Sequence, residues 1–229
     1  MENGGLFCAP WLRTCLLDVE NPNSFAVRFR AARFRRFEAW MASIPRPVTI
    51  LDIGGRTFFW EERGFANRAD IQIVSVNLLR DEQRYENLKP VIGDATNLPQ
   101  FADRSFDIVF SNSVIEHLST FENQCCMAKE VKRVAKRYWV QTPNFWFPLE
   151  PHFFVPGWQW LPESVRVSVI KRWKCGYYGP CRDALAARKV IGEIQLLTRR
   201  QLKILFPNAT LIPERVCGLV KSWTAVGSS

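Results

Sequence analysis

Short apolar runs separated by polar segments dominate the first two thirds of the chain. Val48–Ile53 shows little alternation of polar and apolar positions, which is typical of a strand buried on both faces of a parallel sheet. Similar runs follow at Ile71–Val76, Val91–Ala95, Phe106–Phe110 and Tyr138–Gln141, with helical or turn segments between them. This order predicts an α/β protein whose mostly parallel sheet is covered by helices on both faces.

Helical periodicity precedes the first strand. Between about Ser24 and Ser43, apolar residues recur at i, i+7, i+10, i+14 and i+17, which places them on one stripe of an amphipathic helix. Pro45 and Pro47 then end the predicted helix. Its other faces carry five arginines, so they form either a solvated basic surface or a surface that recruits an anionic substrate or lipid headgroup.

The last part of the chain returns to regular patterns. Glu193–Phe206 is predicted as a helix with Thr198 as its N-cap, and Thr210–Val216 and Lys221–Val226 as two closing strands. An earlier helix is expected after Ser119, because Glu122 follows at the spacing of a capping box. The closing pair raises the predicted sheet to seven strands, and an antiparallel pair on a parallel sheet is an unusual feature.

Residues 143–192 differ from the rest in composition. They combine many aromatic residues and prolines with the basic cluster Lys171, Arg172 and Lys174. We interpret them as an insertion after the fifth strand that caps the carboxyl edge of the sheet. Its aromatic residues form either a simple core or a substrate pocket or membrane-facing patch.

Composition limits the possible classes of protein. The 229 residues carry 31 basic and 22 acidic side chains, a net charge of +9, which suits an anionic partner without identifying one. No apolar run reaches the roughly 18 residues that span a bilayer, and the N-terminus lacks the pattern of a secretory signal. We therefore expect a cytoplasmic protein. The seven cysteines form no C-x-x-C pair, so we expect reduced thiols and no metal site.

Polar residues follow the predicted strands at the edge where parallel sheets bind ligands. The first strand ends in Asp52, followed by the pair Gly54 and Gly55, which lets the backbone turn sharply close to a ligand. Asn77 ends the second strand about two dozen residues later, where an acid would more often contact the ribose of a nucleotide. Gly93-Asp94-Ala95 ends the third strand, and Ser111-Asn112 follows the fourth.

This set of strand ends, in this order, resembles the class I S-adenosylmethionine-dependent methyltransferases, most closely the small bacterial type-11 group. The resemblance covers about residues 47–142, and the closing helix and strand pair more loosely. It implies a Rossmann-like seven-stranded sheet and S-adenosylmethionine as cofactor. It also implies the following contacts: Asp52, Gly54 and Gly55 at the methionine part, Asn77 at the ribose, Asp94 and Ala95 at the adenine, Ser111 and Asn112 under the sulfonium, and Glu116 and His117 on the substrate side.

The chain departs from the family pattern D-x-G-x-G at Arg56, which stands in place of the second glycine. Either Arg56 lowers cofactor affinity, or its side chain reaches the cofactor carboxylate, with which arginine pairs well. The resemblance implies transfer of a methyl group to a small-molecule, glycan or lipid-linked acceptor. If an oxygen or nitrogen is methylated, a base would help remove its proton. The candidates are His117 and His152, the only histidines of the chain, and Glu150 is a further candidate.

Three alternative functions fit parts of the sequence less well. A dinucleotide-dependent oxidoreductase would need G-x-G-x-x-G, which the sequence Gly-Gly-Arg-Thr-Phe-Phe does not supply. A non-catalytic domain that binds a partner through the aromatic insertion is the second alternative. Methylation of nucleic acid is the third, and the absence of an N/D-P-P-[YF] motif argues against it. Peripheral membrane contact through the basic helix and the insertion would fit a lipid-linked acceptor.

The expected organisation has four parts. Residues 1–46 form a lead-in and the amphipathic helix, and residues 47–142 form the cofactor-binding core. Residues 143–192 form the aromatic and basic insertion, which we expect to act as a substrate cap. Residues 193–229 supply the closing helix and strand pair of the core.

Overall fold

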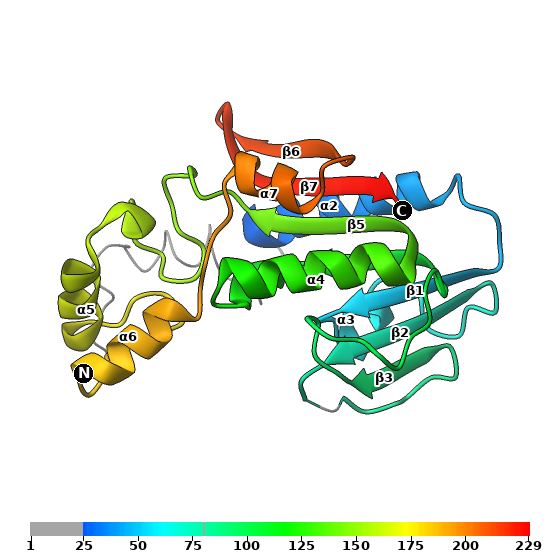
Figure 1. The fold of residues 1–229 in the computed structure, drawn as a ribbon, viewed down its shortest axis with the longest axis horizontal. Helices are drawn as coiled ribbons and strands as arrows, with labels where there is room; N and C mark the ends of the chain where they lie inside the picture. Colours follow the sequence, from blue (N-terminus) through cyan, green and yellow to red (C-terminus); the bar gives the residue numbers. More distant parts are fainter. Residues whose placement is uncertain (1–24, 80) are drawn as a thin grey trace. The chain divides into compact units, whose positions relative to one another are not determined.

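The computed structural model describes residues 25–79 and 81–229. They divide into two compact units, one of residues 44–144 and 195–229, the other of residues 25–43 and 145–194. The first unit contains a single seven-stranded sheet (Figure 1). Its strands are β1 (Val48–Ile53), β2 (Ile71–Asn77), β3 (Leu88–Ile92), β4 (Phe106–Asn112), β5 (Ala135–Pro143), β6 (Thr210–Val216) and β7 (Leu219–Ser228).

The strand order across the sheet is β3-β2-β1-β4-β5-β7-β6. The first five strands of the chain are parallel, and β7 lies antiparallel between β5 and β6. The sequence therefore predicted the mostly parallel sheet and its closing antiparallel pair correctly. Because β3, β2, β1 and β4 are parallel neighbours, their carboxyl ends share one edge of the sheet.

One face of this sheet packs on helix α4 (Phe121–Val134) and helix α7 (Arg199–Leu205). Met127 and Val131 of α4 are fully buried in the same cluster as Leu51 and Val109 of the central strands. This is the helix that the sequence predicted after Ser119. Burial of such side chains contributes about 1.5–3 kcal/mol each, so this face supplies much of the stability of the unit.

Two helix starts were predicted, and one of them was wrong by a residue. Thr198 caps α7 as expected, in a capping box with Gln201. The N-cap of α4 is Thr120, whose hydroxyl oxygen accepts the Asn123 N–H at 3.1 Å. Ser119 instead has a φ of 59°, in the left-handed region. The helix therefore begins one residue later than the capping-box spacing indicated.

The third strand is displaced from its predicted position. β3 spans Leu88–Ile92, so it begins before Val91, and Gly93-Asp94-Ala95 forms a loop. Pro90 lies inside it, which is tolerated because β3 is the edge strand and needs no donor on its outer side. The segment between β2 and β3 contains no helix among its described residues.

The second unit contains helix α2 (Phe25–Met41), the 3₁₀ turn η2 (Trp158–Trp160), helix α5 (Glu163–Arg172) and helix α6 (Ala184–Gly192). Helix α2 confirms the amphipathic helix predicted from about Ser24. Phe153 and Trp158 stack with ring centroids 4.5 Å apart in a small apolar core. Part of the aromatic insertion is therefore simple core.

Helix α6 was not predicted, because the helical pattern was placed after Glu193. None of the described helices is long and apolar enough to cross a membrane.

Candidate active site

The acidic residue at the end of β1 is buried and held by a tryptophan. Asp52 is 2% exposed, and Trp60 Nε1–H donates to its Oδ2 at 2.6 Å. Trp60 comes from the short helix α3 (Thr57–Glu61), and its ring packs edge-on against Phe110 of β4. Burial raises the pKa of Asp52 to about 7, against the opposing effect of the Trp60 hydrogen bond. Near neutral pH this carboxyl therefore exists in both protonation states.

The glycine pair after β1 is required by neighbouring side chains of the chain itself. Gly54 has a φ of +78°, and a Cβ there would lie 2.4 Å from Val114 Cγ2. A Cβ on Gly55 would lie 1.5 Å from Asp52 Oδ2. From the sequence alone, we explained both glycines by the need for the backbone to turn close to a ligand. The structure gives a second reason, because the Asp52 carboxyl and Val114 fill the space where these side chains would stand.

Arg56 occupies its position without backbone strain. It is the N-cap of α3 with φ −128° and ψ 149°, an extended conformation that any residue can adopt, and it is exposed. The missing second glycine therefore causes no strain in this loop. The predicted contact of Arg56 with the cofactor carboxylate stays a prediction.

Asn77 ends β2 beside the glycine loop. Its Oδ1 accepts the Leu78 N–H at 2.8 Å, and its Nδ2 lies 3.4 Å from Gly54 O and 3.5 Å from Gly55 O. The side chain thus links the end of β2 to the loop after β1. The predicted contact with a ribose is untested, and the long amide contacts are the ones that a ligand could replace most easily.

Asp81 is a residue of this edge that the sequence did not single out. Its Oδ2 accepts the Thr57 N–H, the first of helix α3, at 2.7 Å, and this hydrogen bond lowers the pKa of Asp81. The Thr57 hydroxyl donates to Glu82 O at 3.3 Å, and the Tyr85 hydroxyl donates to Glu61 Oε1 at 2.6 Å. The segment after β2 is therefore fastened to the β1 loop. Only its polarity was visible in the sequence.

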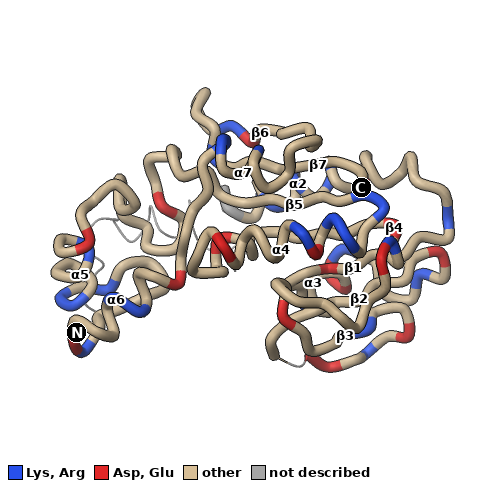
Figure 2. The backbone as a smooth tube through the Cα atoms, in the orientation of Figure 1, with Lys and Arg blue, Asp and Glu red and all other residues tan. Residues whose placement is uncertain are grey.

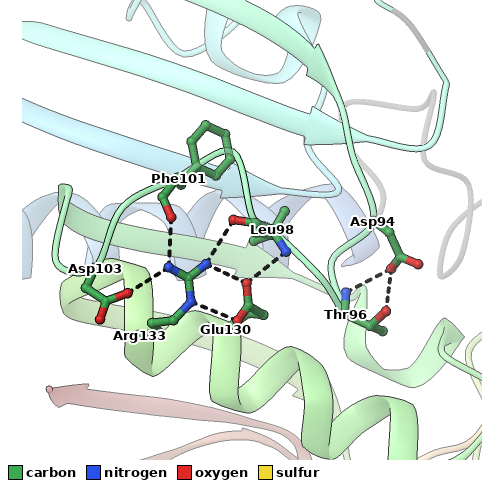
Figure 3. A network of polar contacts seen from close by, with 7 residues as sticks. All are labelled: Asp94, Thr96, Leu98, Phe101, Asp103, Glu130 and Arg133. Atoms are coloured by element: carbon green, nitrogen blue, oxygen red, sulfur yellow. Dashed lines mark hydrogen bonds and ion pairs between the residues drawn. The ribbon is translucent and has the colours of Figure 1, made fainter.

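The loop after β3 begins with Asp94 and is fixed to α4 (Figure 3). Asp94 Oδ1 accepts both the N–H and the hydroxyl of Thr96 at 2.8 Å, which forms a tight local turn. Further along, Arg133 donates to Leu98 O at 2.9 Å and pairs with Glu130 at 2.7 Å. These contacts fix the loop in which the predicted adenine-binding residues Asp94 and Ala95 lie.

Ser111 and Asn112 end β4, next to β1. The Ser111 hydroxyl is fully buried, and among the described residues it has no hydrogen-bond partner. Such a group costs about 1–3 kcal/mol, so a ligand that supplies a partner would be favoured at this strand end. Asn112 is half-buried, in register with Gln141 of β5.

Glu116 and His117 lie in the 3₁₀ turn η1 (Ile115–His117) that follows β4. Glu116 is fully buried, and its Oε2 accepts the Thr142 hydroxyl at 3.0 Å. Its carbonyl oxygen also accepts the Gln195 N–H at 2.7 Å. His117 is exposed. Glu116 therefore has a structural function at the end of β5, whatever further role it has.

Glu150 and His152, the remaining candidates, form a pair in the second unit. His152 Nδ1 lies 2.7 Å from Glu150 Oε1, and the backbone N–H groups of His152 and Phe153 donate to Glu150 Oε2 at 2.7 and 2.6 Å. Glu150 is 1% exposed and His152 9%. The sequence offered the two as separate candidates, whereas the structure joins them into a carboxylate–imidazole pair.

The residues at the shared edge fit the cofactor that the resemblance implies. Asp52, Asn77, Asp94 and Ser111 follow or end four neighbouring parallel strands. The Ser111 hydroxyl, which has no partner among the described residues, leaves a polar group for a ligand at the centre of this edge. The two carboxylates suit the amino group and the exocyclic amine of such a ligand, because they accept hydrogen bonds. The amide and the hydroxyl suit its hydroxyl groups, because they both donate and accept.

Known proteins resemble this chain in sequence and in fold. A family model described as a methyltransferase domain matches residues 54–138. The uncharacterized protein Rv1509 of Mycobacterium tuberculosis is 31% identical over 68 residues, which are 30% of this chain and 23% of that protein. The chain thus matches less than a quarter of the length of this curated relative.

Solved structures match over most of the chain. The N-terminal domain of EvdMO1, crystallised with SAH and D-fucose, has a TM-score of 0.51 at 16% identity, covering 87% of this chain and 82% of that one. The PH0226 protein of Pyrococcus horikoshii OT3 has a TM-score of 0.50 at 15% identity, covering 94% and 95%. The CurJ carbon methyltransferase has a TM-score of 0.52 at 14% identity, covering 90% and 55%. Taken together, the strand order and these folds show that the chain has the fold of the class I S-adenosylmethionine-dependent methyltransferases, and its residues 54–138 match a methyltransferase domain.

Proposed function

We propose that this protein transfers a methyl group from S-adenosylmethionine to an oxygen or nitrogen of a small-molecule, glycan or lipid-linked acceptor. The observation that carries the proposal is the edge of the sheet where β3, β2, β1 and β4 end, because it brings Asp52, Asn77, Asp94 and Ser111 to adjacent strand ends. In open parallel sheets, ligands bind at this edge. The SAH-bound EvdMO1 domain, which has the same fold, supports the choice of cofactor.

When bound, the cofactor supplies a methyl group that is already activated by a sulfonium. The protein then needs to hold the acceptor in line and exclude water. Asp52 is suited to the cationic amino group, since a positive ligand would favour its ionised form and its pKa near 7 makes that form accessible. Asp94 is exposed at the start of its loop, where it can accept from an amine.

His152 is the base that we propose for an acceptor that must lose a proton. Glu150 holds Nδ1 at 2.7 Å, which sets the tautomer with the lone pair on Nε2. A positioned base contributes about 10²–10⁴-fold in rate. We expect His152→Gln to lower kcat and to remove one limb of the pH–rate profile, while the affinity for S-adenosylmethionine stays unchanged. If this variant keeps the wild-type pH profile, His152 is not the base.

Calorimetric titration with S-adenosylmethionine and S-adenosylhomocysteine tests the cofactor assignment. We expect binding that Asp52→Ala and Asp94→Ala abolish. Glu86→Ala is the matched control, because Glu86 is an exposed acid that precedes β3 and so lies at the opposite edge of the sheet. Absence of binding to both ligands by the folded wild-type protein would contradict the proposal and favour the non-catalytic, partner-binding alternative.

Methylation of nucleic acid is the other alternative. The choice of acceptors in a methyl-transfer assay distinguishes it from the function proposed here. Radiolabelled methyl transfer would be measured with extracts of glycans, lipids and small metabolites and, separately, with RNA and DNA. Transfer to nucleic acid alone would contradict the acceptor class proposed here while leaving the cofactor assignment intact.

A further inference from the structure

The segment that follows α5 is basic, aromatic and exposed. Lys171, Arg172, Trp173 and Lys174 are four consecutive exposed residues, and Trp173 is 38% exposed. Tyr177, three residues later, is 55% exposed. We call Lys171–Tyr177 the basic turn. Large rings normally avoid such exposure, so their presence among cations needs an explanation.

The basic turn has a defined conformation. Cys175 is 2% exposed, and its N–H and carbonyl groups exchange hydrogen bonds with Tyr178 at 2.8 and 2.9 Å. A Cβ on Gly176 would lie 2.1 Å from His152 O, so the chain passes close to the Glu150–His152 loop there. Buried Cys175 therefore anchors a turn whose cations and rings face the solvent.

Further apolar side chains of the same unit are exposed. Trp146 is 63% exposed and Trp160 47%, and their ring centroids lie 6.4 Å apart. Val165 on α5 and Leu185 on α6 are 42% and 78% exposed. Tryptophan suits the boundary between water and hydrocarbon, and aliphatic side chains gain by entering it.

The described residues of this unit carry more excess positive charge than the sheet-containing unit. Residues 25–43 and 145–194 carry twelve basic and five acidic side chains, whereas residues 44–144 and 195–229 carry eighteen basic and fourteen acidic ones, of which thirteen of each lie in residues 44–144. Figure 2 shows Lys and Arg on α5 and α6. The segment that contains most of the predicted cofactor residues is thus neutral, and the aromatic unit carries a charge that an anionic surface would complement.

From this combination we propose that the basic turn docks the protein on an anionic phospholipid surface. The cations of Lys171, Arg172 and Lys174 contact headgroup phosphates, and the Trp173 ring inserts at the level of the headgroups. Nucleic acid would use the same cations and rings, but it would gain nothing from exposed Val165 and Leu185. The proposal concerns binding alone, so it can fail or hold independently of the proposed methyl transfer.

Vesicle co-sedimentation of the full chain tests this proposal, with phosphatidylcholine vesicles that contain or lack phosphatidylglycerol. We expect salt-sensitive binding to the anionic vesicles only. Replacing the three cations together, by Lys171→Gln, Arg172→Gln and Lys174→Gln, should weaken that binding by on the order of a hundredfold, at about 1 kcal/mol for each cation near the surface.

The matched control is Lys129→Gln, Arg137→Gln and Arg200→Gln, which removes the same charge from exposed positions of the sheet-containing unit. We expect it to leave binding within a few-fold of wild type. Trp173→Ala should weaken binding by about tenfold, and thermal melting would show that every variant is folded. Because Trp173 is partly exposed, this change tests insertion of the ring without opening the core.

Three results would overturn the proposal. The first is equal sedimentation with both kinds of vesicle, or none with either. The second is an equal loss in the two triple variants, which would show that only net charge matters. The third is wild-type vesicle binding by Trp173→Ala together with tight, Trp173-dependent binding of a single-stranded oligonucleotide, which would assign the basic turn to nucleic acid.

Discussion

Replacing Asp52 by asparagine measures what the buried charge costs the fold. Burial raises the pKa of Asp52 from 3.8 to about 7. Between these values the folded protein holds a proton that the unfolded chain has released, so the free energy of unfolding falls as pH rises through this window. Below the window both states are protonated, and above it both are ionised. At about 1.4 kcal/mol for each pH unit, the loss amounts to about 4 kcal/mol.

The Asp52→Asn variant avoids this loss because it cannot ionise. Its side-chain oxygen can still accept from Trp60 Nε1, which lies 2.6 Å from Oδ2 in the wild type. The new amide N–H groups need acceptors, at a cost of about 1–3 kcal/mol. We therefore expect the variant to be less stable than wild type near pH 4 and about 1–3 kcal/mol more stable near pH 8.

Urea unfolding of both proteins, followed by tryptophan fluorescence at a series of pH values, measures the difference. The comparison between wild type and variant removes the contribution of every other titrating group. Glu86→Gln is the control, because Glu86 is an exposed acid at the opposite edge of the sheet from Asp52. Parallel stability profiles of wild type and Asp52→Asn would refute the reasoning. The same variant should bind S-adenosylmethionine more weakly, so stability would rise while function is lost.

The remaining predictions concern the contacts around this edge. Trp60→Phe leaves a smaller ring and removes the donor to Asp52, so it should lower stability at both pH values through the cavity it opens, and by a further about 1–3 kcal/mol near pH 8, where the carboxylate is ionised, as measured by urea unfolding. Asp81→Ala removes the acceptor of the Thr57 N–H and should cost about 1 kcal/mol and speed hydrogen exchange at that amide, whereas the adjacent Glu82→Ala should not. Arg133→Met removes the donor to two loop carbonyls and should lower both the melting temperature and the affinity for S-adenosylmethionine; unchanged affinity would show that this loop does not position Asp94.

Regularities of the sequence were enough to predict the architecture of the sheet. Strand residues such as Ile50 and Ile73 are buried because the runs that contain them are apolar, and burial of apolar surface dominates folding. The closing pair and the Thr198 cap were likewise readable, because turn and cap signals act within a few residues. Errors arose where the local signal was weak, as in the edge strand β3 and the unpredicted helix α6.

The sequence was also enough to predict which residues lie at the carboxyl edge of the sheet, since a residue that ends a parallel strand lies at that edge. Their partners were decided only by the tertiary structure. Asp52 receives its hydrogen bond from Trp60, and Thr57 is fastened by Asp81, 24 residues away. A local pattern specifies which face of an element is buried, but the contact between two distant side chains depends on how those elements pack. For that reason the raised pKa of Asp52 became visible only in the folded protein.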